Sequence, residues 1–181
     1  MTSGVGAGDV VAFWREAGYQ RWFQGGAGFD GECRERFHDA HFAAARREHD
    51  GWMASADGAL ALVLLLDQIP RNIFRGSGHA FATDPLARHY AARAIEAGFD
   101  GIVDPKLRLF FYMPFEHAED MAGQDRAIAL FTALGDGNLL GYATAHRDVI
   151  ARFGRFPHRN RALGRDNTPE EQAWLDAGGG F

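Results

Sequence analysis

The stretch Ala59–Asn72 reads ALALVLLLDQIPRN, and it decides how this chain folds. Its residues from Ala59 to Leu66 are all apolar, and alanine and leucine predominate, which favours a helix that is hydrophobic on every side. Such a helix belongs at the centre of a globular protein. Pro70 has no amide hydrogen and disfavours helical geometry at Ile69, so the sequence predicts a kink or a new helix start there.

Helix caps and apolar spacing predict the remaining helices. Asp9 can cap a first helix, glycines at 25, 26 and 28 interrupt the pattern after it, and the Thr83-Asp84-Pro85 and Asp104-Pro105 motifs each place a capping residue before a proline. Thr168 and Glu171 form a capping box. The predicted helices cover about residues 10–20, 30–48, 55 or 57 to 68, 86–96, 106–112, 118–134, 138–153 and 169–177. The sequence contains no long alternation of apolar and polar β-branched residues. It therefore predicts an all-α fold, a compact antiparallel array of about eight helices.

Length and composition fit one globular domain. The chain has 181 residues, of which 46% are hydrophobic and 24% charged. We expect a single helical domain over residues 1–181, with residues 1–7 disordered and residues 154–167 forming an irregular segment across the helices. A formal net charge of -5 argues against broad nucleic-acid binding, although it leaves room for a local basic pocket.

Several features predict a soluble cytoplasmic protein. The N-terminus lacks the basic region and long apolar run of a signal peptide. The longest apolar run, Ala59–Leu66, is far shorter than the roughly 20 residues that a membrane span needs. Cys33 is the only cysteine, which excludes an intrachain disulfide and indicates a reducing compartment.

An aromatic run passes into an ionisable run between Phe110 and Asp120. Glu116, His117, Glu119 and Asp120 lie within five positions, and burying them without partners would be costly. One interpretation is an acid–base or ligand site. The other is structural: Glu119 and Asp120 stabilise a helix N-terminus while Glu116 pairs with an arginine. His146 and His158 could complete a metal-ligand set, but the spacing matches no known metal signature, so we assign no metal ligands.

A cationic stretch, residues 152–160, offers partners for these acids. Arg155 and Arg159 could bind an anionic ligand through bidentate contacts. Alternatively, the stretch is a clasp: Phe153, Phe156 and Pro157 pack on the helices, and the arginines neutralise acids at positions 67, 116 or 120. Both interpretations stay open, because a binding site often uses a structural ion-pair network.

The polar end of the apolar helix is a third candidate. Asp67 and Arg71 lie one turn apart and can pair if the helix continues, while Gln68 and Asn72 project from the neighbouring stripe. These groups either line a polar pocket whose floor is the apolar helix, or form a network that holds the kink.

Three motifs together resemble a known family. They are residues 65–72 with Arg75-Gly76, Ala80-Phe81 and Asp84; residues 111–117; and residues 153–160 with Leu163-Gly164-Arg165. In this order they resemble the bacterial family filed as domain of unknown function 924. The resemblance implies a compact helical fold similar to tetratricopeptide-repeat proteins, and it implies no activity. Ala118 departs from the pattern, because the family commonly has a serine there. Without that serine, Glu119 and Asp120 serve the helix start through the helix dipole alone, or the start moves upstream.

The functional hypothesis joins the three stretches in one polar pocket that binds a small anionic ligand. Such a pocket could also serve an acid–base enzyme. The catalytic candidates are Glu116, His117 and His158, and the ligand-binding candidates are Asp67, Gln68, Arg71, Asn72, Arg155, Arg159 and Asn160. The alternative is a non-catalytic module that binds a peptide or protein and whose charged motifs are structural. The sequence names no cofactor and no oligomeric state, and nucleic-acid and membrane partners are not expected.

Overall fold

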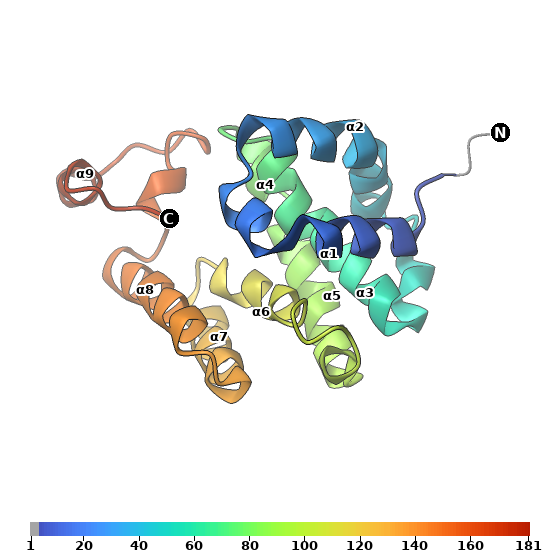
Figure 1. Cartoon of the computed structure of the whole chain (residues 1–181). Coiled ribbons are helices and arrows are strands. Elements are labelled where there is room, and N and C mark those ends of the chain that lie inside the picture. Colours follow the sequence, from blue (N-terminus) through green and yellow to red (C-terminus); the bar gives the residue numbers. More distant parts are fainter. Residues whose placement is uncertain (1–3) are drawn as a thin grey trace. The chain divides into compact units, whose positions relative to one another are not determined.

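The computed structural model describes residues 4–181, and within them it contains helices and no strands (Figure 1). The chain divides into two compact units. Unit 1 consists of the described residues up to Arg75 together with His79–Pro114, and unit 2 consists of Gly76–Gly78 together with Phe115–Phe181. The α-helices are α1 (Ala7–Gln24), α2 (Gly26–Ala45), α3 (Ala56–Val63), α4 (Ile69–Ile73), α5 (Asp84–Glu96), α6 (Leu109–Glu116), α7 (Met121–Leu134), α8 (Gly137–Phe153) and α9 (Pro169–Asp176). Short 3-10 helices are η1 (Asp50–Ala54), η3 (Gly78–Phe81), η4 (Phe99–Gly101) and η5 (Pro157–Arg159), and η2 (Leu64–Gln68) is a π-helix.

The prediction of an all-α fold is confirmed. Because α3, η2 and α4 follow one another without a break, they count as one continuous helix, and the described residues then contain eight helices. The prediction of a single domain over the whole chain stays a prediction. Residues 1–3, part of the segment expected to be disordered, lie outside the described residues. Residues 4–6 have no regular secondary structure, and α1 already begins at Ala7.

The apolar helix is the core of unit 1, as predicted. Every residue from Ala59 to Leu66 is fully buried. Helices α1 and α5 pack on α3, while α2 packs on α4 (Figure 1). The aromatic half of the Phe110–Asp120 stretch is buried as well. Its first residue, Phe110, packs against Trp14 at a centroid distance of 5.6 Å, and Trp14 in turn packs against Phe29 at 5.7 Å.

The predicted kink or new helix start at Ile69 takes the form of a π-helical turn, after which α4 begins at Ile69. Ile69 has helical dihedrals, and its amide donates to the carbonyl of Leu64, five residues back. The carbonyl of Leu65 thereby loses its usual donor, and the carbonyl of Leu66 lacks one because Pro70 has no N–H. Side chains from outside the helix supply replacements: His41 Nδ1 lies 2.8 Å from the oxygen of Leu65, and Thr83 Oγ1 donates to that of Leu66 at 2.6 Å. The helix thus absorbs the proline as one wide turn.

Of the four predicted caps, three are wrong and one is confirmed. Asp104 accepts from the amide of Lys106 at 3.0 Å, but this bond lies in a turn before α6, which begins at Leu109. Helix α1 is capped at Gly6, whose amide donates to the carboxylate of Asp9 at 2.8 Å, so Asp9 lies inside the helix. The cap position of α5 is Thr83, and its hydroxyl goes to the π-helix instead of the helix end. Thr168 opens α9 with the predicted capping box.

Several helix boundaries also differ from the predictions. Helix α1 kinks at Gly18, where φ is +69°, and then continues to Gln24; α2 begins directly after Gly25, so Gly28 lies inside it. A glycine accepts this positive φ without the steric penalty of a Cβ. Helix α6 begins three residues later than predicted and continues through Pro114.

Unit 2 is built around the helix pair α7 and α8, which pack along each other (Figure 1). Its core contains Val149, Ile150 and Phe156, with Phe153 and Trp174 packed against them. Helix α8 ends at Gly154, and the chain then runs through η5 and a series of turns before α9. This irregular path therefore contributes an aromatic side chain, Phe156, to the core.

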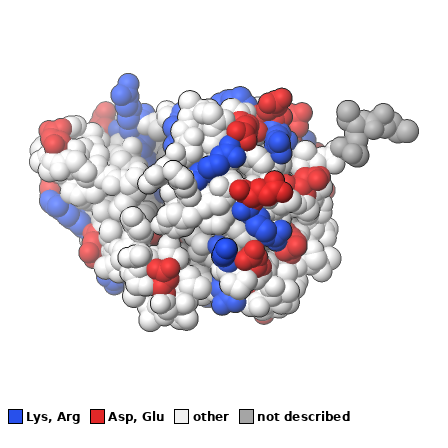
Figure 2. Space-filling model, in the orientation of Figure 1, with Lys and Arg blue, Asp and Glu red and all other residues white. Residues whose placement is uncertain are grey.

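Among residues 4–181, no helix combines the length and the apolarity that crossing a bilayer requires. Lysines and arginines are interspersed with acidic residues on the face shown in Figure 2. Exposed pairs such as Arg46–Glu48 and Arg47–Asp50, both at 2.7 Å, illustrate this alternation. The cytoplasmic location stays a prediction.

Replacing Thr83 by valine tests whether the wide turn depends on its outside donors. Thr83→Val keeps the side-chain shape but removes the donor to the buried Leu66 carbonyl, and we expect a loss of about 1–2 kcal/mol in the free energy of unfolding. Urea denaturation measures it. Thr83→Ser retains the hydroxyl and should lose clearly less; equal losses in the two variants would contradict a role for the hydrogen bond.

Candidate functional site

The stretch Asp67–Asn72 lies in unit 1, and its first residue pairs as predicted. Asp67 is fully buried, and its carboxylate lies 3.2 Å from Arg71 Nη1, one turn further along the helix. Gln68 Nε2 donates to the same carboxylate at 2.6 Å. The π-helix therefore carries a buried carboxylate that is neutralised within its own segment.

Arg71 links this segment to the start of α5. Its guanidinium makes two hydrogen bonds to the carboxylate of Asp84, at 2.7 and 2.9 Å, and a third to the carbonyl of Asp67 at 2.7 Å. It also lies over the ring of Phe81, 5.5 Å from the centroid. Asp84, which the sequence suggested as a helix cap, is instead an ion-pair partner.

Asn72 and Arg75 share a partner on α2. Asn72 Nδ2 donates to Asp30 Oδ1 at 2.8 Å, and Arg75 makes bonds of 2.7 and 2.8 Å to the two oxygens of the same carboxylate. Although burial acts in the opposite direction, the bond from Arg75 holds the pKa of Asp30 below its usual value. These contacts favour the interpretation of the stretch as a network that holds the helix end.

The ionisable half of the second stretch lies in unit 2, between α6 and α7. Glu116 is the last residue of α6, and Asp120 caps α7 by accepting a hydrogen bond from the amide of Gly123 at 2.7 Å. The expectation that the helix start would rely on the dipole alone is therefore wrong. The cap of α7 is Asp120, and the helix starts downstream of Ala118.

Glu119 does not serve the helix start, because it is part of a clasp. Its carboxylate accepts two hydrogen bonds from Arg165, at 2.7 and 2.9 Å, and one from the amide of Phe156 at 2.8 Å. Burial acts to raise the pKa of Glu119, but the bonds from Arg165 and Phe156 outweigh it and lower the pKa. The carboxylate thus joins the start of α7 to the irregular segment after α8.

A second clasp holds the last helix. Glu171 in α9 is 2% exposed and accepts bonds of 2.7 and 2.8 Å from Arg155, together with one of 2.8 Å from the amide of Thr168. The bond from Arg155 lowers the pKa of Glu171 to about 2. Asn160, fully buried, donates to the same carboxylate at 3.3 Å and accepts from Arg165 at 2.8 Å. Two predicted ligand-binding residues, Arg155 and Asn160, therefore have structural partners.

The arginines of the stretch do pair with acids, as the clasp interpretation expects, but these acids are not the ones it named. Arg155 neutralises Glu171, and Arg152 pairs with Glu170 at 2.9 Å. The sequence had offered acids at positions 67, 116 and 120 instead. The acids in α9 follow the segment closely in sequence, and the capping box that starts α9 brings them back towards it.

Glu116 meets a histidine from α8. Its carboxylate lies 3.1 Å from Nδ1 of His146, and the same nitrogen lies 2.9 Å from the carbonyl oxygen of Tyr142. Both groups are largely buried, with side-chain exposures of 5% for Glu116 and 12% for His146. Because both neighbours of Nδ1 are acceptors, that nitrogen carries the proton, and Nε2 of the neutral ring carries the lone pair.

His117, His158 and Arg159 lie near enough to His146 for their charges to act on it. The rings of His117 and His146 are 6.3 Å apart, while Phe156 lies 5.6 Å from both His146 and His158. Arg159 lies over Phe156, with its guanidinium 4.5 Å from the ring centroid. We call Glu116, His117, His146, His158 and Arg159 the His146 cluster. It contains all three predicted catalytic residues and one predicted anion-binding residue.

Burial lowers the pKa of His146 well below its usual range, and the charges of His117 and Arg159 act in the same direction. The nearby carboxylate of Glu116 and the carbonyl of Tyr142 favour the protonated ring but do not outweigh burial. A neutral imidazole with a fixed tautomer can accept a proton at Nε2 and return it, which is the chemistry of a general base and acid.

His146 entered the sequence analysis only as a residue that could complete a metal-ligand set. The spacing of α8 contained a stronger signal: Ala143 and Ile150 are buried, and His146 lies three and four residues from them on the same helical face. Within the described residues, no group of three or more His, Cys, Asp or Glu side chains is arranged to hold a metal ion.

Comparison with known proteins gives a family. The family model for bacterial proteins of unknown function DUF924 matches residues 10–179. The chain belongs to this family. A solved structure of a protein of unknown function, ATU0120 from Agrobacterium tumefaciens, is similar to it with 56% sequence identity and a TM-score of 0.91, over 94% of this chain and 97% of that one. No curated protein matches. The resemblance of the three motifs to DUF924 is thereby confirmed.

Breaking one clasp tests its contribution to the stability of this DUF924 protein. Arg155→Gln leaves the buried Glu171 carboxylate without its main partner, and we expect a loss of about 2–3 kcal/mol in the free energy of unfolding. Arg152→Gln removes the same charge from an exposed pair and should change stability by less than about 0.5 kcal/mol. Equal effects in urea denaturation would contradict the clasp.

The pH dependence of stability tests the neutral state of His146. The unfolded chain protonates its histidines near pH 6.5, whereas burial keeps His146 neutral in the folded state to lower pH. The unfolded state therefore binds more protons below pH 6.5, and stability falls as the pH falls through this range. Between pH 7 and pH 5 we expect His146 to account for a loss of roughly 1–2 kcal/mol.

The matched variants are His146→Asn and His89→Asn. Asparagine at position 146 can still donate a hydrogen bond but cannot titrate, so the fall in stability between pH 7 and pH 5 should become smaller. His89 is exposed, and His89→Asn should retain the dependence of the parent protein. A dependence that is unchanged in His146→Asn would show that the ring has the same pKa in the folded state as in the unfolded chain, which would contradict its burial as a neutral group.

Proposed function

We propose that unit 2 binds a small anionic ligand at the His146 cluster and that the Glu116–His146 pair transfers protons there. The observation that carries this proposal is the 3.1 Å contact between the buried Glu116 carboxylate and His146 Nδ1. A carboxylate on one imidazole nitrogen fixes the tautomer and orientation of the ring and stabilises the imidazolium that forms when the other nitrogen takes a proton. The pair therefore has the composition of a general base that is oriented by an acid.

Arg159 supplies the anion-binding charge in this proposal. A guanidinium stays charged at every physiological pH and can bind carboxylate or phosphate through two parallel hydrogen bonds. Arg159 is only 6% exposed, and its contact with Phe156 holds it beside the histidines. In such a partly dry environment an anion gains more from the charge than it would at the surface.

Three other candidates have acidic partners in the fold. Arg155 binds the buried Glu171 at 2.7 Å, Asn160 donates to the same carboxylate at 3.3 Å, and Arg71 binds Asp84 at 2.7 Å. Their contacts support a structural role. In this proposal Arg159 and the three histidines form the ligand site, and the clasps hold the segment that carries Arg159 and His158.

An NMR titration with inorganic phosphate and with acetate tests the proposal. At constant ionic strength we expect phosphate to shift the imidazole nitrogen resonances of His146 and His158 in a saturable way and to raise the melting temperature. Arg159→Gln should abolish both effects. Arg159→Lys keeps the charge but not the bidentate geometry, and it should retain weakened binding.

Arg152→Gln is the control, because it removes the same charge from an exposed arginine of the same stretch. It should bind phosphate as the parent protein does. The proposal fails if phosphate and acetate leave the three imidazoles of the cluster unperturbed, or if Arg152→Gln and Arg159→Gln weaken binding equally. In the second case the anions would only be responding to net charge.

A further inference from the structure

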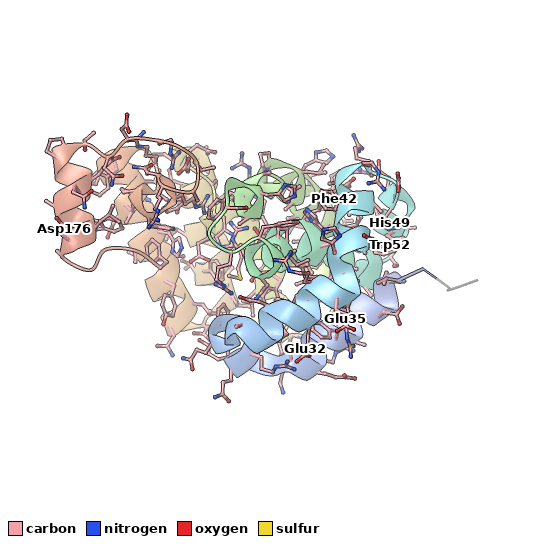
Figure 3. All side chains as sticks on the ribbon, turned by 90° about the horizontal axis from the view of Figure 1, so that it is seen from above. Glu32, Glu35, Phe42, His49, Trp52 and Asp176 are labelled. Atoms are coloured by element: carbon pink, nitrogen blue, oxygen red, sulfur yellow. The ribbon has the colours of Figure 1, made fainter. Side chains whose placement is uncertain are left out.

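Two histidines outside the His146 cluster meet in unit 1. His41 lies on α2 and is fully buried, and His79 lies on η3 and is half-buried. Their Nε2 atoms are 3.0 Å apart. The neighbouring residue of α2, Phe42, is labelled in Figure 3. This histidine pair is independent of the residues used in the proposed function.

The hydrogen bond of His41 to the π-helix determines which of its nitrogens is free to bind. Its Nδ1 lies 2.8 Å from the carbonyl oxygen of Leu65, which only accepts, so Nδ1 carries the proton. In the neutral ring Nε2 therefore presents its lone pair to His79. Histidines that bind metals show this arrangement almost without exception: one nitrogen donates to a carbonyl or carboxylate and the other binds the metal.

The spacing of the two Nε2 atoms fits two ligands of one metal ion. Nitrogen ligands at about 2.1 Å from a metal are roughly 3.0 Å apart when they subtend a right angle and about 3.4 Å apart at the tetrahedral angle. The 3.0 Å distance between the Nε2 atoms of His41 and His79 equals the value for a right angle. A single proton between the two nitrogens fits the same distance, and a metal ion would take the place of that proton.

Aromatic rings hold both imidazoles in position. Phe42 lies 5.1 Å from His41 and 5.2 Å from His79, and Phe74 lies 5.5 and 4.1 Å from them. Such rings restrict the rotation of both ligands and limit the access of water. Two imidazole nitrogens do not favour hard cations such as Ca²⁺ or Mg²⁺, which take oxygen ligands.

We propose that His41 and His79 form an open two-histidine site for a divalent first-row transition metal such as Zn²⁺, Ni²⁺ or Cu²⁺. Imidazole is a preferred ligand of these ions. No third protein ligand joins the pair among the described residues, so water or a ligand from solution completes the coordination.

Metal titration of the full chain without a histidine tag tests this site. After treatment with a chelator, the protein is titrated with Zn²⁺ by calorimetry and with Co²⁺ by visible absorption. We expect one equivalent to bind and to raise the melting temperature. His79→Asn should weaken binding roughly tenfold or more, because it removes one of two protein ligands. His41→Asn should do the same, since asparagine keeps a donor for the Leu65 carbonyl but lacks the second nitrogen.

His89→Asn is the control, because it removes an exposed histidine from α5 by the same substitution. It should bind with unchanged stoichiometry and affinity. The proposal is overturned if the parent protein binds neither metal, or if His79→Asn binds as tightly as His89→Asn, which would identify an adventitious ion only. If His41→Asn does not fold, the comparison of His79→Asn with His89→Asn decides alone.

Discussion

A buried backbone carbonyl must have a donor, and this requirement organises unit 1 around its central helix. The helix from α3 to α4 is buried along the whole run Ala59–Leu66, so water cannot serve any of its carbonyls. Pro70 removes one donor, and the wide turn displaces another. His41 from α2 and Thr83 from the start of α5 replace them, and the packing of α2 and α5 is thereby tied to one proline.

In unit 2 the carboxylates divide into two chemical classes. Glu119 and Glu171 each accept several hydrogen bonds, including two from an arginine, and these bonds lower the pKa of both groups. A carboxylate held in this way has little capacity to bind a proton near neutral pH. Glu116 meets the imidazole of His146, whose pKa is lowered by burial. The first class holds the fold, and the second is the basis of the proposed proton transfer.

The parts of the structure that depend on local sequence were predictable. The all-α class, the burial of the apolar helix, the pairing of Asp67 with Arg71 and the capping box at Thr168 all follow from residues within a few positions of one another. Some errors were local, such as the cap at Gly6 in place of Asp9, but others involve partners that are distant in sequence. Asp84 was expected to cap a helix because its neighbours suggest a helix start, yet it binds Arg71, which lies 13 residues earlier.

The residues of the candidate site also divide into those that the local sequence marks and those that it does not. Glu116, His117, His158 and Arg159 were recognised because they stand in dense ionisable runs. His146 stands alone in its helix, and only the burial of the face it shares with Ala143 and Ile150 marks it. A pairing between α6 and α8 depends on how two helices pack, and single-sequence periodicity shows which face is buried but not which helix lies against it.

The two units use one device for different chemistry. In each, a buried histidine presents Nδ1 to a backbone carbonyl, that of Leu65 for His41 and that of Tyr142 for His146. This contact places the lone pair on Nε2 in both cases.

At His146 a carboxylate also meets Nδ1 and stabilises a positive ring, which suits a group that takes up a proton. At His41 the free nitrogen faces a second imidazole, and two neutral nitrogen donors at this spacing suit a metal ion better than a proton carrier. The neighbours of each ring, and not the ring itself, therefore determine what it can bind.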